Sequence, residues 1–301
     1  MYGENSKYSV GHEYNEVDNA IIFHGSCLDF SPTIPDKKVK LIVTSPPYNI
    51  GKKYEKKSSL DQYYEMQEQI IDESVRILSD DGSICWQVGN YINNSEIIPL
   101  DVFLYPIFQK HNLKLRNRII WTFGHGLHAK KRFSGRYETV LWFTKSDNYT
   151  FNLDNVRIPQ KYPNKKHFKG KKIGHLSCNP LGKNPADIWE IPNVKSNHVE
   201  KTLHPCQFPV ALVERLVLAL TNEYDLIYDP FMRVGTSLIA ALKNKRRGMG
   251  AEIIDEYVLS AMDRIRQLGN GTLKTRPINK PVYEPDTPLK NLNYEKETLF
   301  I

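Results

Sequence analysis

The chain has 301 residues, of which 40% are hydrophobic and 25% are charged. This is the composition of a folded globular protein rather than of a disordered one. No apolar run approaches the roughly 20 residues of a membrane-spanning helix, and the N-terminus carries no signal-peptide core. We therefore expect a cytoplasmic protein without a membrane partner.

The positive charge of the chain is concentrated in one segment. The net charge is +7, and residues 161–172, "KYPNKKHFKGKK", carry six lysines among Tyr162, His167 and Phe168. Such a segment can neutralise phosphates while its rings stack on bases, although a solvated loop explains it equally well. The four cysteines lie far apart without a C-x-x-C pair, which indicates reduced thiols and no metal site.

In chain order, the first half of the sequence predicts strands that alternate with helices. The predicted elements are strands at 19–24 and 39–44, a helix at about 60–78, a strand at 83–89, a helix at 100–112, and strands at 116–123 and 137–144. Asp80, Asp81 and Gly82 are expected to stop the first helix. This alternation predicts an α/β fold with a doubly wound, mostly parallel sheet and helices on both faces.

The second half begins with a long stretch that has no sustained period. Residues 146–200 are rich in Asn, Lys, Pro and Gly, and a segment of this length inside a compact domain is usually functional or disordered. Regular elements then return as a helix at 208–222, a strand at 225–230, a helix at 238–245, a strand at 248–254 and a helix at 256–268. The tail after residue 270 is expected to wrap the surface.

The stretch 41–50, "LIVTSPPYNI", joins a buried strand to a stiff loop. Pro46 and Pro47 cannot continue a sheet ladder, because proline lacks the backbone N–H. Their fixed backbone holds the hydroxyl of Ser45, carbonyl groups without ladder partners, and the ring of Tyr48. The sequence therefore predicts a rigid cluster of hydrogen-bond acceptors beside a flat ring.

A second constellation lies between residues 225 and 252. A strand ends at Asp229, a tight turn carries Gly235 and Thr236, and the next strand ends in Glu252. This order is typical of the first βαβ unit of a nucleotide-binding fold, where the acidic residue accepts the ribose hydroxyls. The phosphate-binding glycine pattern and the Walker lysine are absent, so a cofactor such as S-adenosylmethionine fits, with a plain structural βαβ unit as the alternative.

Together, "VTSPPY" at 43–48 and the later "DPFMRVGTS" and "GAE" resemble the DNA amino-methyltransferases of the N4-cytosine and N6-adenine family. The catalytic loop comes first, as in the circularly permuted β group, and the resemblance covers roughly 19–268. It implies one Rossmann-like, S-adenosylmethionine-dependent methyltransferase domain. Its parts would be a catalytic-loop half (1–145), an irregular DNA target-recognition segment (146–200), and a cofactor-binding half with the C-terminal tail (201–301).

The resemblance also implies a role for each matching residue. The Ser45 hydroxyl and the Pro46 carbonyl would accept the N–H groups of an exocyclic amino nitrogen, held by the Pro46–Pro47 backbone. Tyr48 would stack on a target base that has left the duplex. The implied cofactor-binding residues are Asp229, Phe231, Gly235, Thr236, Glu252, His204 and Ser26, and the lysines expected to bind DNA are Lys165, Lys166, Lys169, Lys171 and Lys172.

The predicted function is that of a site-specific methylase of a prokaryotic type II restriction–modification system, protecting double-stranded DNA from a cognate endonuclease. Cytosine N4 is favoured because serine precedes the two prolines, and adenine N6 is the alternative because "PPYN" is common among adenine enzymes. Arg233 replaces the first glycine of the family's F-x-G-x-G turn. This leaves open a catalytically weakened, DNA-binding relative, and methylation of RNA or protein is a further alternative.

Overall fold

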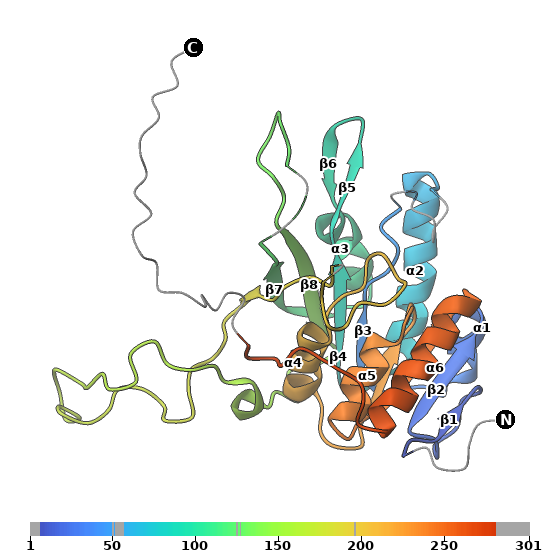
Figure 1. Ribbon diagram of the computed structural model, residues 1–301. Coiled ribbons are helices and arrows are strands. Elements are labelled where there is room, and N and C mark those ends of the chain that lie inside the picture. The colour runs from blue at the N-terminus through green and yellow to red at the C-terminus, as the bar shows by residue number, and fades with distance from the viewer. Residues whose placement is uncertain are drawn as a thin grey trace.

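The computed structural model describes residues 7–49, 51, 57–124, 126, 128–195 and 197–280. Within these residues, nine strands form one sheet in the order β1-β2-β11-β10-β3-β4-β8-β7-β9 (Figure 1). They are β1 (Val10–Gly11), β2 (Ala20–His24), β3 (Val39–Thr44), β4 (Leu78–Val88), β7 (Lys114–Thr122), β8 (Tyr137–Thr144), β9 (Ile188–Glu190), β10 (Leu226–Asp229) and β11 (Arg247–Glu252). Strands β5 (Asn90–Asn93) and β6 (Glu96–Pro99) form a separate hairpin.

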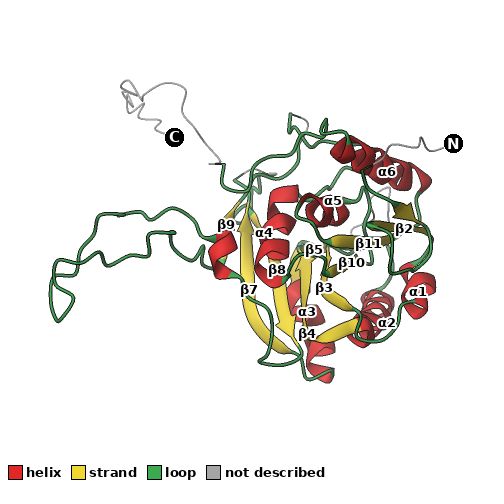
Figure 2. Ribbon diagram, turned by 90° about the horizontal axis from the view of Figure 1, so that it is seen from below, coloured by secondary structure: helices red, strands yellow, loops and turns green. Residues whose placement is uncertain are grey.

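The sheet is mostly parallel, as the sequence predicted. All neighbours from β1 to β4 pair parallel, while β8 pairs antiparallel with both β4 and β7. Helices cover both faces (Figure 2). One face carries α4 (Val210–Leu220), α5 (Thr236–Lys243) and α6 (Asp255–Gly269), and the other carries α1 (Cys27–Phe30), α2 (Leu60–Ile77) and α3 (Leu100–Lys110). Two short 3₁₀ helices, η1 (Ser31–Thr33) and η2 (Leu153–Val156), complete the regular structure described.

The central strands are buried on both faces, and their sequences explain why. All six residues of β3, "VKLIVT", are buried, and the β-branched side chains among them favour a strand. Helix α2 begins with a capping box between Ser59 and Gln62, which satisfies two backbone N–H groups at its first turn. The polar face of α2 remains in solvent while its apolar face packs against the sheet.

The observed local structure departs from the sequence-based expectation at three places described here. Residues 80–82 do not form a turn after α2, because β4 starts directly at Leu78 and runs through them with a shifted register against β3. A charged contact between Lys40 and Asp81 holds that part of the strand. The hairpin of β5 and β6 was not predicted, and β9 lies inside the segment predicted to be irregular, where it pairs with β7.

Several segments project from the body of the molecule. The β5–β6 hairpin and the loop between β7 and β8 rise side by side from the end of the sheet where the parallel strands have their carboxyl ends (Figure 1). Residues 157–187 form a long arm that extends away from the body in both views (Figures 1 and 2), tied by isolated bridges such as that between Ile158 and Lys183. None of the helices in the described ranges has the length and apolar character needed to cross a membrane.

Candidate active site

Strands β3 and β10 lie side by side at the point where the winding of the sheet reverses. Leu41 of β3 pairs with Ile227 of β10, and the chain leaves β3 towards β4 but leaves β10 towards β11. Ligands of open α/β sheets bind outside the carboxyl ends of the strands at such a point. There the hydroxyl of Thr44 donates a hydrogen bond of 2.6 Å to the Asp229 carboxylate, so the two predicted motifs meet.

The loop Ser45–Tyr48, here called the SPPY loop, is fixed by its own contacts and by α2. The carbonyl oxygen of Pro47 accepts a hydrogen bond of 2.9 Å from the hydroxyl of Tyr63. The hydroxyl oxygens of Ser45 and Tyr48 lie 3.3 Å apart. Ser45 is 3% exposed, so its hydroxyl is held in a defined place rather than in bulk solvent.

The SPPY loop separates two cavities. One, the turn cavity, has a volume of about 180 Å³ and is lined by Pro47 together with residues around the β10–α5 turn. The other, the loop cavity, has a volume of about 630 Å³ and is lined by Ser45 and Tyr48 together with the projecting loops. The two sides of one rigid loop therefore face two different spaces.

Four of the predicted cofactor-binding residues line the turn cavity, namely Ser26, His204, Phe231 and Glu252. The Glu252 carboxylate accepts a hydrogen bond of 2.9 Å from the backbone N–H of Ile254, and burial raises the pKa of Glu252. The Nδ1 atom of His204 accepts a hydrogen bond of 3.2 Å from the backbone N–H of Cys206. The Ser26 hydroxyl also caps the N-terminus of α1. Ser26 therefore has a structural role in addition to lining the cavity.

Asp229, Gly235 and Thr236 lie behind the turn cavity instead of lining it. The Asp229 carboxylate is fully buried and accepts hydrogen bonds from Thr44 and Ser237, both at 2.6 Å, and from the N–H of Phe231 at 3.0 Å. Burial raises the pKa of Asp229. Gly235 has φ 72°, and a Cβ there would lie 2.9 Å from the Cβ of Ala261.

The buried contacts of Asp229 and Gly235 support the β10–α5 turn. Thr236 shares this placement, because it is 1% exposed and its hydroxyl oxygen accepts a hydrogen bond of 3.1 Å from Arg264. Direct cofactor contact from Asp229, Gly235 and Thr236 stays a prediction. A buried carboxylate needs donors from the protein itself, and β3, the turn and α5 each provide one to Asp229.

Two residues of the loop cavity were missed by sequence analysis, Gln87 of β4 and Glu138 of β8. The Glu138 carboxylate accepts hydrogen bonds from the Gln87 amide at 2.5 Å and from the Tyr48 hydroxyl at 3.3 Å. Burial, with the Glu138 charge as the next cause, raises the pKa of Tyr48 well above its ordinary value, so the phenol stays protonated. The available signal was a long polar or charged side chain in each of two mostly apolar strands, Gln87 in "SICWQVG" and Glu138 in "YETVLWFT".

The direction of these hydrogen bonds fixes the state of Ser45. Tyr48 has one hydroxyl proton and donates it to Glu138, so the contact between Tyr48 and Ser45 is made by the serine proton. The lone pairs of the Ser45 oxygen then remain available to a donor in the loop cavity. The chain Glu138–Tyr48–Ser45 therefore orients the serine as an acceptor.

Arg233 stands between the two cavities and lines both. Its backbone has φ 51°, in the left-handed region that favours glycine, and the residue is 8% exposed. Its guanidinium donates hydrogen bonds to the carbonyl oxygens of Cys206 at 3.2 Å and Pro46 at 3.3 Å. The carbonyl expected to accept a target amino group thus already accepts a hydrogen bond from this arginine.

The five lysines expected to bind DNA are all exposed and lie on the projecting arm. They line neither of the two cavities. Within the arm, Lys166 forms an isolated bridge with Leu176. Their contribution to DNA binding stays a prediction.

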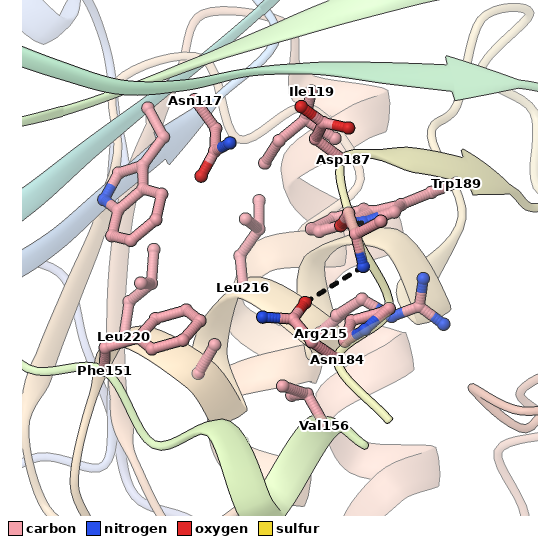
Figure 3. A pocket seen from close by; sticks show the side chains of 14 residues that line it. Asn117, Ile119, Phe151, Val156, Asn184, Asp187, Trp189, Arg215, Leu216 and Leu220 are labelled. Carbon is pink, nitrogen blue, oxygen red and sulfur yellow. Dashed lines mark hydrogen bonds between the residues drawn. The ribbon is translucent and has the colours of Figure 1, made fainter. Parts of the chain in front are cut away.

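A third cavity, of about 320 Å³, lies between β7, β8 and α4 (Figure 3). Asn117 and Ile119 point into it from β7, and Leu216 from α4. The Arg215 guanidinium lies 5.0 Å from the ring centroid of Trp189. No residue of the SPPY loop or of the β10–α5 turn lines this cavity. It lies where the arm joins the body.

Comparison with known proteins shows which family the chain resembles in sequence. The family described as N6_N4_Mtase, DNA methylase, matches residues 39–263. Type II methyltransferase M.BglII of Bacillus subtilis is 50% identical over 238 residues, which cover 79% of this chain and 66% of that protein. The chain therefore spans slightly less than two thirds of this relative.

Solved structures agree in fold. The cytosine-N4-specific PvuII DNA methyltransferase superposes with a TM-score of 0.66 at 18% identity, covering 93% of this chain and 100% of that one. M1.HpyAVI, solved in complex with S-adenosylmethionine (SAM), gives a TM-score of 0.57 at 20% identity, covering 82% and 98%. The match of sequence over most of the chain, with the shared fold, shows that the chain belongs to the N6_N4_Mtase family of DNA methylases.

Proposed function

We propose that this DNA methylase transfers the methyl group of SAM to an exocyclic amino nitrogen within a short specific sequence of double-stranded DNA. One observation carries the proposal: the SPPY loop is the wall between two cavities. Pro47 faces the turn cavity, while Ser45 and Tyr48 face the loop cavity. A methyl donor in the first space and a base in the second would meet at this loop.

The side chains of the turn cavity suit an adenosine-containing ligand. Glu252 presents a carboxylate that can accept ribose hydroxyls, and Phe231 offers an apolar ring for packing. When bound, SAM supplies an electrophilic methyl group on a positively charged sulfur. A solved relative that holds SAM supports the assignment.

The loop cavity provides what a poor nucleophile needs. An exocyclic amino nitrogen delocalises its lone pair into the ring, so acceptors at its N–H groups are required to localise that pair and to stabilise the developing positive charge. Ser45 is oriented as such an acceptor by Tyr48 and Glu138, and the Pro46 carbonyl would be the second. Holding the nitrogen in line with the methyl group contributes further to the rate enhancement.

Cytosine N4 is the proposed target, because serine precedes the two prolines. Adenine N6 is the alternative, supported by the continuation of the loop into Asn49. In either case the base leaves the duplex, since its amino group cannot reach an in-line position while stacked. A cognate restriction endonuclease would be the functional partner.

The test is methyl transfer with product identification. The purified chain is incubated with isotopically labelled SAM and unmethylated bacterial DNA, and the digested nucleosides are separated by mass. We expect labelled N4-methylcytosine; labelled N6-methyladenine would support the alternative base. Label in RNA or protein but not in DNA would contradict the proposal, and sequencing of modified bases from expressing cells would map the site.

One contact favours a second candidate, a methylase with weakened turnover. The hydrogen bond from Arg233 to the Pro46 carbonyl takes one of the two lone pairs of an acceptor that catalysis would use. The same assay with Arg233→Gly separates the two candidates. Faster product formation by the glycine variant would support the weakened enzyme, whereas equal rates from both chains would support the unimpaired one.

A further inference from the structure

The loop between β7 and β8 presents a phenyl ring to solvent at the active-site end of the sheet. Phe133 is fully exposed, in a loop that rises beside the β5–β6 hairpin (Figure 1). Large aromatic side chains usually bury most of their surface in a folded chain. A ring held in water at this place is free to contact a partner that binds at the same end of the sheet.

The shape of the loop is supported by hydrogen bonds on both sides of the ring. The Ser134 hydroxyl oxygen accepts a bond of 3.0 Å from the backbone N–H of Ala129. The Arg132 guanidinium donates a bond of 3.5 Å to the carbonyl of Ser95 in the turn of the β5–β6 hairpin. Ile92 of that hairpin is 47% exposed and also lines the loop cavity. The two projections thus form one connected rim.

This rim borders the loop cavity, where the target base is proposed to sit. Ala129, Arg132 and Gly135, on either side of Phe133, line that cavity. Lys130, Lys131 and Arg132 precede the ring directly, and all three are exposed. Cations in this arrangement bind the phosphates of a duplex, and they would bring the ring against its base pairs.

Resting on the proposed function, we propose that Phe133 inserts into the base stack of the target duplex and fills the space that the extruded base leaves. Extrusion breaks two stacking contacts and leaves a gap between the neighbouring pairs. A flat apolar ring can stack on the exposed faces of these pairs, and apolar side chains are known to insert between base steps. The partner that covers the ring is the DNA itself.

A matched control exists in the same chain. Phe168 is also a phenylalanine in a lysine-rich segment and is 77% exposed. It lies on the arm and does not line the loop cavity. If exposed rings near lysines acted through nonspecific stacking alone, removal of either ring would have the same effect on base extrusion.

The probe is a duplex selected from a random-sequence library by binding to the full chain with S-adenosylhomocysteine. A fluorescent analogue, 2-aminopurine or pyrrolocytosine, replaces each base of that duplex in turn. Fluorescence at saturating protein reports the extrahelical population without a contribution from affinity or from methyl transfer. Wild-type protein is expected to raise the signal at one position, which marks the extruded base.

At that position, Phe133→Ala should lower the extrahelical population about fivefold or more, the effect of one lost stacking contact. Phe133→Trp and Phe168→Ala should retain it, and a mismatch at the same position should restore the signal of Phe133→Ala. A wild-type signal from Phe133→Ala, or a loss that the mismatch does not restore, would overturn the proposed role of Phe133 and leave the proposed methyl transfer unaffected. No signal from the wild-type chain at any position would overturn base extrusion, and with it both proposals.

Discussion

At the scale of single residues, Arg233 places a guanidinium where the family has a glycine. Its φ of 51° is a strained conformation for arginine that glycine adopts without strain. Its guanidinium donates a hydrogen bond to the Pro46 carbonyl. We expect Arg233→Gly to tighten SAM binding and to raise methylation. Strain of this kind costs about 1–3 kcal/mol, equivalent to roughly five- to a hundredfold in an equilibrium constant.

Calorimetric titration with SAM and a methyl-transfer assay measure the two effects of Arg233→Gly. Lys245→Gly is the control, because Lys245 also has a positive φ, 61°, but lines neither cavity. An increase from both variants would assign the effect to backbone strain alone. If Arg233→Gly binds no better and the parent chain already turns over at a normal rate, the arginine is an accommodated part of the site.

Ser45 offers the second test at this scale. Ser45→Ala should lower the methyl-transfer rate by about a hundredfold or more, as expected when a transition-state acceptor is removed. Cofactor affinity should remain nearly unchanged, because Ser45 faces the loop cavity and not the turn cavity. Single-turnover kinetics and calorimetry separate the two quantities; an equal loss of cofactor affinity would mean that the SPPY loop is assigned to the wrong step.

Glu252 predicts how cofactor affinity depends on pH. Burial raises the pKa of this carboxyl, and its ionised form is the one that accepts two ribose hydroxyls. Affinity should therefore be full above the raised pKa and fall as the pH decreases through it, starting above the ordinary value of 4.5 for a glutamate. Titrations between neutral and acidic pH measure this; Glu252→Gln should bind more weakly and lose the pH dependence.

At the scale of elements, the arm of residues 157–187 carries the predicted DNA contacts. Replacing Lys165, Lys166, Lys169, Lys171 and Lys172 together by glutamine should flatten the salt dependence of duplex binding. Each phosphate contact contributes about −0.9 to the slope of log affinity against log salt, so a loss of several units is expected. The exposed pair Lys37 and Lys38, far from the arm in sequence and facing Asp80 and Glu16, gives a control in which the slope should stay the same.

The elements also show what a single sequence can and cannot predict. The buried strands β3 and β10 were predicted because apolar, β-branched runs end at recognisable motifs, and helices α2 to α6 because their apolar residues recur at helical spacing. Helix α1 has four residues and was not predicted. Strand β9 has three residues, too few for a period, and it forms only because β7 offers an unpaired edge. Gln87 and Glu138 lie in different strands and meet through the pairing of β4 with β8, which no local pattern encodes.

At the scale of the whole molecule, one buried carboxylate links the two halves of the chain through hydrogen bonds. Asp229 accepts hydrogen bonds from Thr44 in the first half and from Ser237 in the second. Asp229→Ala would leave these hydroxyls and the Phe231 N–H without their acceptor, which we expect to lower the free energy of unfolding by about 3 kcal/mol. It should also abolish SAM binding by loosening the turn. Denaturant titration and calorimetry test both, and unchanged stability would contradict this role.

The position of β10 in the sheet has a consequence for biosynthesis. Strands β2 and β3 follow each other in the chain but are separated in the sheet by β11 and β10, and Thr44 lies 185 residues before its partner Asp229. At about 5–20 residues per second, translation of that interval takes roughly ten to forty seconds. Throughout it, the backbone N–H and C=O groups along one edge of β3 lack the strand that they pair with in the finished protein. The nascent chain therefore presents an aggregation-prone edge to chaperones until its last third has left the ribosome.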